Sequence, residues 1–206
     1  MKTVSINIAT YNRKALLDRT LESIFRQNVK DIEVIVIDDG STDDTESLKD
    51  KYPIIYGQTG TNVYDARSTK PYNLAAEMSK GDIIIQQNAE CYHWSDNVIN
   101  RLVESVGDKH CAFATVFNLA NPFIDRESID TYNQDHTVAT IMYSGKARRV
   151  AWFFCGAILK KDWHLCGGYG DSAPVDVNFA SRMEVEGFTH EWLDDVFVIH
   201  QTHAKS

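Results

Sequence analysis

The chain has 206 residues, of which 43% are hydrophobic and 24% charged, and its formal net charge is −8. This length and apolar content suit one sizeable core, so we expect residues 1–206 to form a single domain. The acidic balance argues against a general nucleic-acid-binding protein, because basic side chains that neutralise phosphates supply most of the affinity in such proteins.

The sequence predicts no membrane-spanning or signal segment, and it predicts that the cysteines form neither a zinc site nor disulfides. No apolar stretch approaches the roughly 20 residues that a membrane-spanning helix needs, and the N-terminal residues lack the apolar core of a signal peptide. We therefore expect a cytoplasmic protein. The four cysteines lie far apart without a C-x-x-C pair, which favours buried thiols over a zinc site or disulfides.

The first half of the chain alternates short apolar runs with segments of helical spacing. The runs rich in β-branched residues predict strands at residues 4–9, 32–37, 53–56, 82–87 and 111–117. Between them, helices are predicted at residues 14–28, from Ser41 with Asp44 in a capping-box position, at residues 72–80 closed by Gly81, and from Ser95 to residue 106. This order predicts a three-layer α/β/α sandwich with a mostly parallel central sheet.

The second half of the chain is less regular. Strands are predicted at residues 151–159 and 197–199, and a helix at residues 174–186. Residues 118–149 show no clear period, and a loop of this length inside a compact domain is usually functional. We expect this segment to contribute to substrate specificity.

Polar clusters follow three of the predicted strands, at residues 10–13, 38–41 and 88–91. In a parallel sheet the carboxyl ends of the strands share one edge, and ligands bind outside that edge. Carboxylates there could hold Mg²⁺ or Mn²⁺ against the phosphates of a nucleotide. A single acidic residue after a strand is about as often a turn residue as a ligand-binding residue. The prediction therefore depends on all three clusters together.

Several of these stretches resemble the family 2 glycosyltransferases of the GT-A fold. The resemblance begins with IATYNR at residues 8–13, SIFRQ at 23–27 and VIVIDDGSTDDT at 34–45, and continues with NLAA at 73–76 and KGDIIIQQNAE at 80–90. Weaker matches are GAIL at 156–159, GGY at 167–169 and residues 176–187. The similarity covers most of the chain except residues 118–149.

The resemblance implies a GT-A catalytic domain that moves a sugar from a nucleotide-diphosphate sugar, such as a UDP-sugar, to an acceptor hydroxyl. It also implies a divalent metal, Mn²⁺ or Mg²⁺, and inversion of the anomeric centre. Asp39 would accept a hydrogen bond from the base. The residues that the resemblance places around the donor are Ala9, Thr10, Tyr11, Arg13, Asp39, Asn73 and Asn88.

Metal binding is implied for Glu90, which falls where the family has its metal-binding carboxylate. Asn88 takes the first position of that motif, where the family usually has an aspartate, so the cation would depend more on Glu90 and the diphosphate. A late histidine can complete the metal shell in related enzymes, and His203 fits this role better than His200. The alternative is that Glu90 and His203 are solvated residues without a ligand.

Asp176 is the candidate catalytic base. It follows Pro174, which is favoured in the first turn of a helix, and the helix dipole there stabilises the ionised form that a base requires. The family usually has an acidic pair at this point, whereas this chain has Val175 before Asp176. On residue chemistry alone, a carboxylate with only an electrostatic role at the helix N-terminus is the competing interpretation.

Other functional classes fit less well. A sugar-phosphate nucleotidyltransferase would open with a Gly-rich basic loop, and a dinucleotide dehydrogenase with G-x-G-x-x-G, and neither follows the first predicted strand. The altered positions Asn88 and Val175 motivate a non-catalytic nucleotide-sugar-binding module as a further alternative. The acceptor stays open among a glycan, a lipid, a protein side chain and a modified nucleobase.

Overall fold

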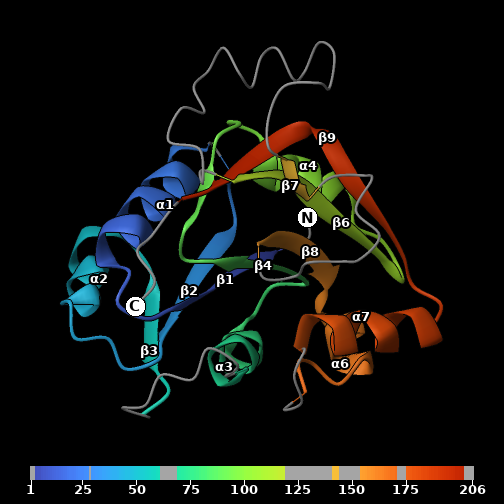
Figure 1. Cartoon of the computed structure of the whole chain (residues 1–206), viewed down its shortest axis with the longest axis horizontal. Coiled ribbons are helices and arrows are strands. Elements are labelled where there is room, and N and C mark those ends of the chain that lie inside the picture. Colours follow the sequence, from blue (N-terminus) through green and yellow to red (C-terminus); the bar gives the residue numbers. More distant parts are fainter. Residues whose placement is uncertain are drawn as a thin grey trace.

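A computed structural model of the chain describes residues 3–27, 29–60, 69–118, 141–143, 154–170 and 175–201, with the side chains of 118, 141–143, 175 and 176 excepted. Its centre is a nine-stranded sheet in the order β3-β2-β1-β4-β8-β6-β9-β5, with β7 paired to β6 (Figure 1). Of residues 118–149, the segment expected to contribute to substrate specificity, only 118 and 141–143 belong to the described part, so that expectation lies outside it.

One half of the sheet is parallel. It contains β1 (Val4–Thr10), β2 (Ile32–Asp38), β3 (Ile55–Gln58) and β4 (Ile83–Asn88). β1 lies in the middle and pairs in parallel with both β2 and β4. The apolar, β-branched runs that predicted β1, β2 and β4 are explained by their burial on both faces, whereas the edge strand β3 is only partly buried.

The other half of the sheet is mixed. It contains β8 (Cys155–Leu159), β6 (His110–Asn118), β9 (Thr189–His200), β5 (Cys91–His93) and β7 (Ile141–Tyr143). β8 returns antiparallel between β4 and β6, while β6 and β9 are parallel to each other. The predicted sandwich is confirmed, but its sheet is parallel only in the first half, because β8 enters the sheet from the opposite end.

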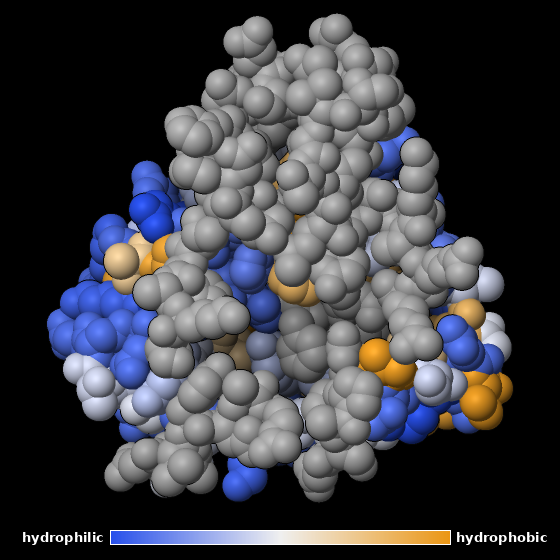
Figure 2. Space-filling view, in the orientation of Figure 1, coloured by the Kyte–Doolittle hydropathy of each residue, from blue (hydrophilic) through white to orange (hydrophobic). Residues whose placement is uncertain are grey.

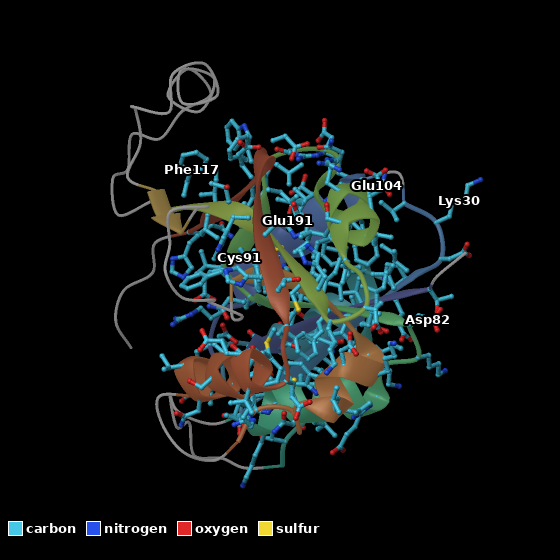
Figure 3. The ribbon with its side chains drawn as sticks, turned by 90° about the vertical axis from the view of Figure 1, so that its right-hand side faces the viewer. Lys30, Asp82, Cys91, Glu104, Phe117 and Glu191 are labelled. Atoms are coloured by element: carbon cyan, nitrogen blue, oxygen red, sulfur yellow. The ribbon has the colours of Figure 1, made fainter. Side chains whose placement is uncertain are left out.

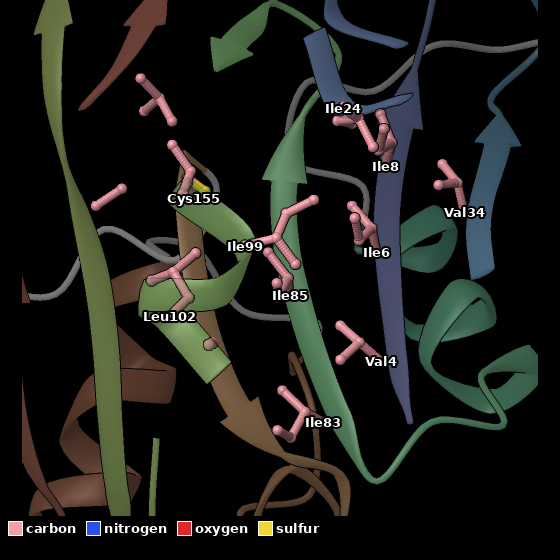
Figure 4. Packing of buried hydrophobic residues seen from close by; sticks show 14 of the residues in the cluster. Val4, Ile6, Ile8, Ile24, Val34, Ile83, Ile85, Ile99, Leu102 and Cys155 are labelled. Atoms are coloured by element: carbon pink, nitrogen blue, oxygen red, sulfur yellow. The ribbon is translucent and has the colours of Figure 1, made fainter. Parts of the chain in front are cut away.

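Helices cover both faces of the sheet (Figure 1). On one face lie α1 (Lys14–Arg26), α2 (Leu48–Lys51) and α4 (Val98–Ser105); on the other lie α3 (Lys70–Met78), α6 (Lys160–Leu165) and α7 (Val175–Val185). Alternate residues of β1 and β4, such as Ile6 and Ile85, pack with Ile24 and Ile99 on the first face (Figure 4). A second cluster, which includes Trp163 and Phe179, fills the other face.

The predicted helix caps at Ser41 and Ser95 are wrong. The first helix after β2 is a short 3₁₀ turn, Thr45–Ser47, and neither it nor α4 has a side-chain cap. The two serines bond elsewhere: Asn12 N–H donates to Ser41 Oγ at 2.8 Å, and Phe197 N–H donates to Ser95 Oγ at 3.1 Å. The Ser41 hydroxyl therefore connects two loops, and the Ser95 hydroxyl connects a loop to β9, across sequence separations that local patterns do not encode.

Gly81 does not close α3, because that helix ends at Met78 with Ser79 as its C-cap. Its role is a close approach of two backbones. A Cβ atom at this position would lie 2.6 Å from the backbone nitrogen of Ser5, in β1. Gly81 N–H also donates to Ser5 Oγ at 2.8 Å.

Gly81→Ala is expected to destabilise the protein by about 1–3 kcal/mol, the usual cost of overpacking against atoms that cannot move aside. Gly107→Ala is the matched control, because its nearest atom to a new Cβ lies at 3.7 Å, an ordinary contact. Chemical denaturation of both variants measures the difference. Equal stabilities of the two variants would contradict the close approach.

His93 lies at the centre of a buried polar network that joins α1, β4 and β5. Gln27 Nε2 donates to His93 Nδ1 at 2.7 Å, and His93 Nε2 donates to Gln87 Oε1 at 2.7 Å. Because the two glutamine atoms are fixed as donor and acceptor, the ring is the neutral Nε2–H tautomer. Burial, with a smaller effect from Arg26, lowers the pKa of His93 from 6.5 to about 3.

This pKa shift predicts acid sensitivity. In the unfolded chain His93 binds a proton below its ordinary pKa of 6.5, whereas in the fold it stays neutral down to a pKa of about 3. Stability is therefore retained above pH 6.5 and lost as the pH falls below it, by about 2 kcal/mol between pH 7 and pH 5. Denaturant unfolding at both pH values should show this loss in the wild type and a smaller one in His93→Gln.

The described part also shows the state of the cysteines, the polarity of the helices and the distribution of apolar surface. All four cysteines are free and buried, as predicted. The helices of the described part are each too short or too polar to cross a bilayer. Hydrophilic surface covers the side of α1 and α2, while apolar surface gathers near α6 and α7 (Figure 2). Leu165 and Val185, which are 51% and 86% exposed, lie on these two helices.

Candidate active site at the carboxyl edge of the sheet

The register of three parallel strands places the predicted polar clusters side by side. Thr10 is opposite Asp38 of β2, and Ala9 is opposite Asn88 of β4. Ala9 and Asn88 are both partly exposed, whereas the rest of β1 and β4 is buried. The sheet is therefore open to a ligand at one point of this edge, between the ends of β1 and β4.

The Asp38 carboxylate stabilises the turn after β2. Its Oδ1 accepts hydrogen bonds from the backbone N–H groups of Gly40 at 3.1 Å and Ser41 at 2.8 Å. Its Oδ2 accepts the hydroxyl of Tyr56 at 2.5 Å. Gly40 has φ of 96°, which favours glycine. The buried Asp38 carboxylate is thus satisfied by the protein itself.

Asp39 lies beside β1 and faces a different set of groups. Its backbone N–H donates to Thr10 O at 2.9 Å, which extends the β1–β2 pairing by one residue. Its Oδ1 accepts the hydroxyl of Thr59 at 2.6 Å, just after β3. Thr59 and Tyr56 were not predicted as site residues, since neither stands in a recognisable motif.

The loop after β1 is locked against the loop after β2. Asn12 adopts φ of 49°, and its Oδ1 accepts the backbone N–H of Thr42 at 2.7 Å. Lys14 N–H, at the start of α1, donates to Asp43 Oδ2 at 2.8 Å. These bonds give residues 10–13 a fixed conformation at the edge where Ala9 and Asn88 open.

Glu90 lies between two basic side chains. Its Oε2 is 3.9 Å from Arg13 Nε, and its Oε1 is 3.3 Å from His200 Nε2. Strand pairing explains the second contact, because His200 of β9 is opposite Cys91 of β5, the residue after Glu90. Figure 3 shows Cys91 beside β9. The Phe154 ring lies 5.0 Å from the His200 ring.

Residues 10–13 thus join the two predicted carboxylates. Thr10 bonds to the backbone of Asp39, and Arg13 reaches Glu90. The two acidic residues follow strands on either side of β1, and at one strand spacing of about 4.8 Å each, these strands are roughly 10 Å apart. That distance is within the reach of one nucleotide sugar.

Other predicted residues lie at varied distances from this edge. Thr10 is buried, and its hydroxyl has no hydrogen bond within the described ranges. Tyr11 is half-buried next to it. Asp176 is in the first turn of α7, as predicted, although its side chain is not described. His203 lies outside the described residues, and within them no group of three His, Cys, Asp or Glu residues forms a metal cluster.

Asn73 makes two hydrogen bonds to the backbone of Tyr169. Its Nδ2 donates to Tyr169 O at 2.8 Å, and its Oδ1 accepts Tyr169 N–H at 3.0 Å. It thereby connects α3 to the turn after α6. The neighbouring Tyr72 reaches the edge itself, because its hydroxyl donates to Asn88 Oδ1 at 3.0 Å.

The adjacent aspartates are expected to differ in their effect on folding. Asp38→Ala should lower the free energy of unfolding by about 2–3 kcal/mol, because three donors lose a buried acceptor. Asp39→Ala removes the acceptor of the Thr59 hydroxyl and should cost about 1 kcal/mol. Denaturant titration of both variants tests this; a larger loss in Asp39→Ala would contradict the assignment of Asp38 to the turn.

Comparison with known proteins agrees with this architecture. Residues 5–158, more than half of the chain, match the model of the family described as glycosyl transferase family 2. The chain therefore belongs to glycosyltransferase family 2.

One curated relative is UDP-Glc:alpha-D-GlcNAc-diphosphoundecaprenol beta-1,3-glucosyltransferase WfaP of Escherichia coli. It is 30% identical over 131 residues, and the match covers 64% of this chain and 50% of the relative. This chain thus corresponds to about half the length of that protein.

Two solved structures show the same fold. The mannosyltransferase PcManGT from Pyrobaculum calidifontis, solved with GDP-Man and Mn²⁺, has a TM-score of 0.67 at 18% identity, covering 96% of this chain and 56% of that one. S. aureus TarS 1-349, solved with UDP-GlcNAc, has a TM-score of 0.70 at 15% identity, covering 98% and 60%. The fold is of the GT-A type.

Proposed function

We propose that this chain transfers a sugar from a nucleotide-diphosphate sugar to an acceptor hydroxyl, with a divalent metal and with inversion at the anomeric carbon. Family membership supports sugar transfer. The observation that carries the proposal for the site is the contact of residues 10–13 with both Asp39 and Glu90. One short loop thereby joins a proposed base pocket to a proposed metal–diphosphate position.

The nucleotide would lie across the ends of β2, β1 and β4. In this proposal Asp39 accepts from the base, while Ala9, Thr10, Tyr11 and Arg13 line the pocket. The two solved structures of the same fold contain GDP-Man and UDP-GlcNAc. We propose a UDP-sugar for this chain, from the resemblance of its opening motif.

The Glu90 carboxylate has the oxygen ligands that Mn²⁺ and Mg²⁺ prefer. Its Oε2 is beside Arg13, while its Oε1 is 3.3 Å from His200 Nε2. Mg²⁺ and similar ions are often held by one or two protein ligands together with substrate phosphates. We propose Glu90 as a ligand, with a histidine from the C-terminal segment, His203 or His200. When bound, the cation neutralises charge on the departing diphosphate.

Asp176 is proposed to remove the proton from the acceptor hydroxyl. Its position in the first turn of α7 favours the ionised carboxylate through the helix dipole. Arg182 of the same helix donates to Cys166 O at 2.9 Å, which fixes the helix to the turn after α6. The base helix is thereby anchored to the same turn that Asn73 holds from α3.

Asp176→Asn is expected to reduce sugar transfer or donor hydrolysis by at least a hundredfold, the usual contribution of a general base, while donor binding is retained. Radiolabelled UDP- and GDP-sugars with Mn²⁺ provide the assay, and removal of the metal with EDTA should abolish turnover in the wild type. Asp108→Asn is the matched control, since Asp108 is an exposed partner of Lys161.

The alternatives predict different results. A non-catalytic binding module would bind the nucleotide sugar without turnover in either the wild type or Asp176→Asn. A sugar-phosphate nucleotidyltransferase would release pyrophosphate from a nucleoside triphosphate. Thermal shift with a panel of nucleotide sugars would identify the donor first, because a ligand that binds the folded state raises its stability.

A further inference from the structure

Asn88 has a hydrogen-bonding arrangement that defines which of its atoms can meet a ligand. Its Oδ1 accepts the Tyr72 hydroxyl at 3.0 Å. Its Nδ2 makes no hydrogen bond to the protein within the described ranges, and the residue is partly exposed at the open point of the sheet edge. An asparagine amide has one acceptor oxygen and one N–H₂ donor group, so engaging the oxygen leaves the donor for a ligand.

Tyr72 is held firmly enough to impose this orientation. It lies in the first turn of α3, directly after Pro71, which fixes the backbone there. Its ring packs edge-on against Tyr169, with 5.7 Å between the centroids and 88° between the planes. Asn73, the next residue, makes two hydrogen bonds to the backbone of Tyr169, and these bonds hold the two rings next to each other.

Tyr169 is in turn fixed in the core on the α6–α7 face. It is 2% exposed, and its ring lies 4.8 Å from that of Trp163 and 5.1 Å from that of Phe179. The hydroxyl of Tyr72 is therefore positioned by packed aromatic rings rather than by a surface contact. If the Asn88 amide were rotated by 180°, its N–H₂ group would face the Tyr72 hydroxyl, which could then only accept, and the proton that this hydroxyl now donates to Asn88 Oδ1 would lose that acceptor.

We propose that Tyr72 is a positioning residue that orients the Asn88 amide, so that Asn88 donates its N–H₂ group to oxygen atoms of the nucleoside diphosphate. This inference rests on the proposed function. Position 88, where the family usually has an aspartate, would then offer the nucleotide a neutral hydrogen-bond donor in place of a carboxylate. Tyr72 acts through Asn88 and has no contact of its own with the nucleotide in this arrangement.

A double-mutant cycle tests the proposal, with binding of UDP and of GDP in the presence of Mn²⁺ measured by calorimetry on the full chain. Tyr72→Phe should weaken binding about three- to tenfold, the range for one neutral hydrogen bond. Asn88→Ala should weaken it at least as much. Adding Tyr72→Phe to Asn88→Ala should cause no further loss, because the residue that Tyr72 positions is gone.

Tyr52→Phe is the matched control, since the Tyr52 hydroxyl donates to Asp18 Oδ1 at 2.6 Å on the opposite, α1 side of the sheet. It should leave nucleotide binding unchanged. Thermal unfolding of every variant confirms that it is folded. The inference about Tyr72 would be overturned, without affecting the proposed function, by either of two results. One is a Tyr72→Phe variant that binds the nucleotides with wild-type affinity, and the other is a Tyr72→Phe change that weakens binding equally in the wild type and in Asn88→Ala. A wild type that binds neither nucleotide would overturn the proposed function as well.

Discussion

The parallel pairing of β1 with β2 on one side and β4 on the other is the constraint on which the site depends. Backbone hydrogen bonds fix the register, so Thr10 meets Asp38 and Ala9 meets Asn88. A shift of one residue would turn the apolar side chains of β1 to the wrong face, and burial of Ile6 and Ile8 prevents it. The loops after the three strands therefore meet at one edge.

Polar residues at this edge differ in what they contact within the protein. Asp38 and Asp39 are neighbours in sequence, yet Asp38 is used by three donors of the protein while Asp39 stands beside β1 and Thr59. Asn12 and Ser41 likewise join two loops. Rigid loops matter for catalysis because a ligand then binds without the cost of ordering them.

The mixed half of the sheet completes the site from a distance. β9 runs beside β5, and this pairing carries His200 to Glu90 across more than a hundred residues of sequence. The buried hydrogen bonds of His93 stabilise β5, because they join it to the C-terminal end of α1 and to β4. The position of Glu90 thus depends on packing in the core as well as on the turn that follows β4.

Residue patterns were sufficient to predict the α/β/α sandwich, its four parallel strands and the polar residues at their ends. Strands buried on both faces need apolar β-branched runs, and parallel strands end at one edge of the sheet. The sequence also indicated the family through contiguous motifs. The contacts of each polar side chain, by contrast, depend on how the strands and helices pack in the folded chain. Ser41 and Ser95 were predicted as local helix caps, but their hydroxyls accept from Asn12 and Phe197, and the amide of Asn73 bonds to Tyr169. Such partners are far apart in the chain, and strand register and helix packing bring them together, so no local pattern could reveal them.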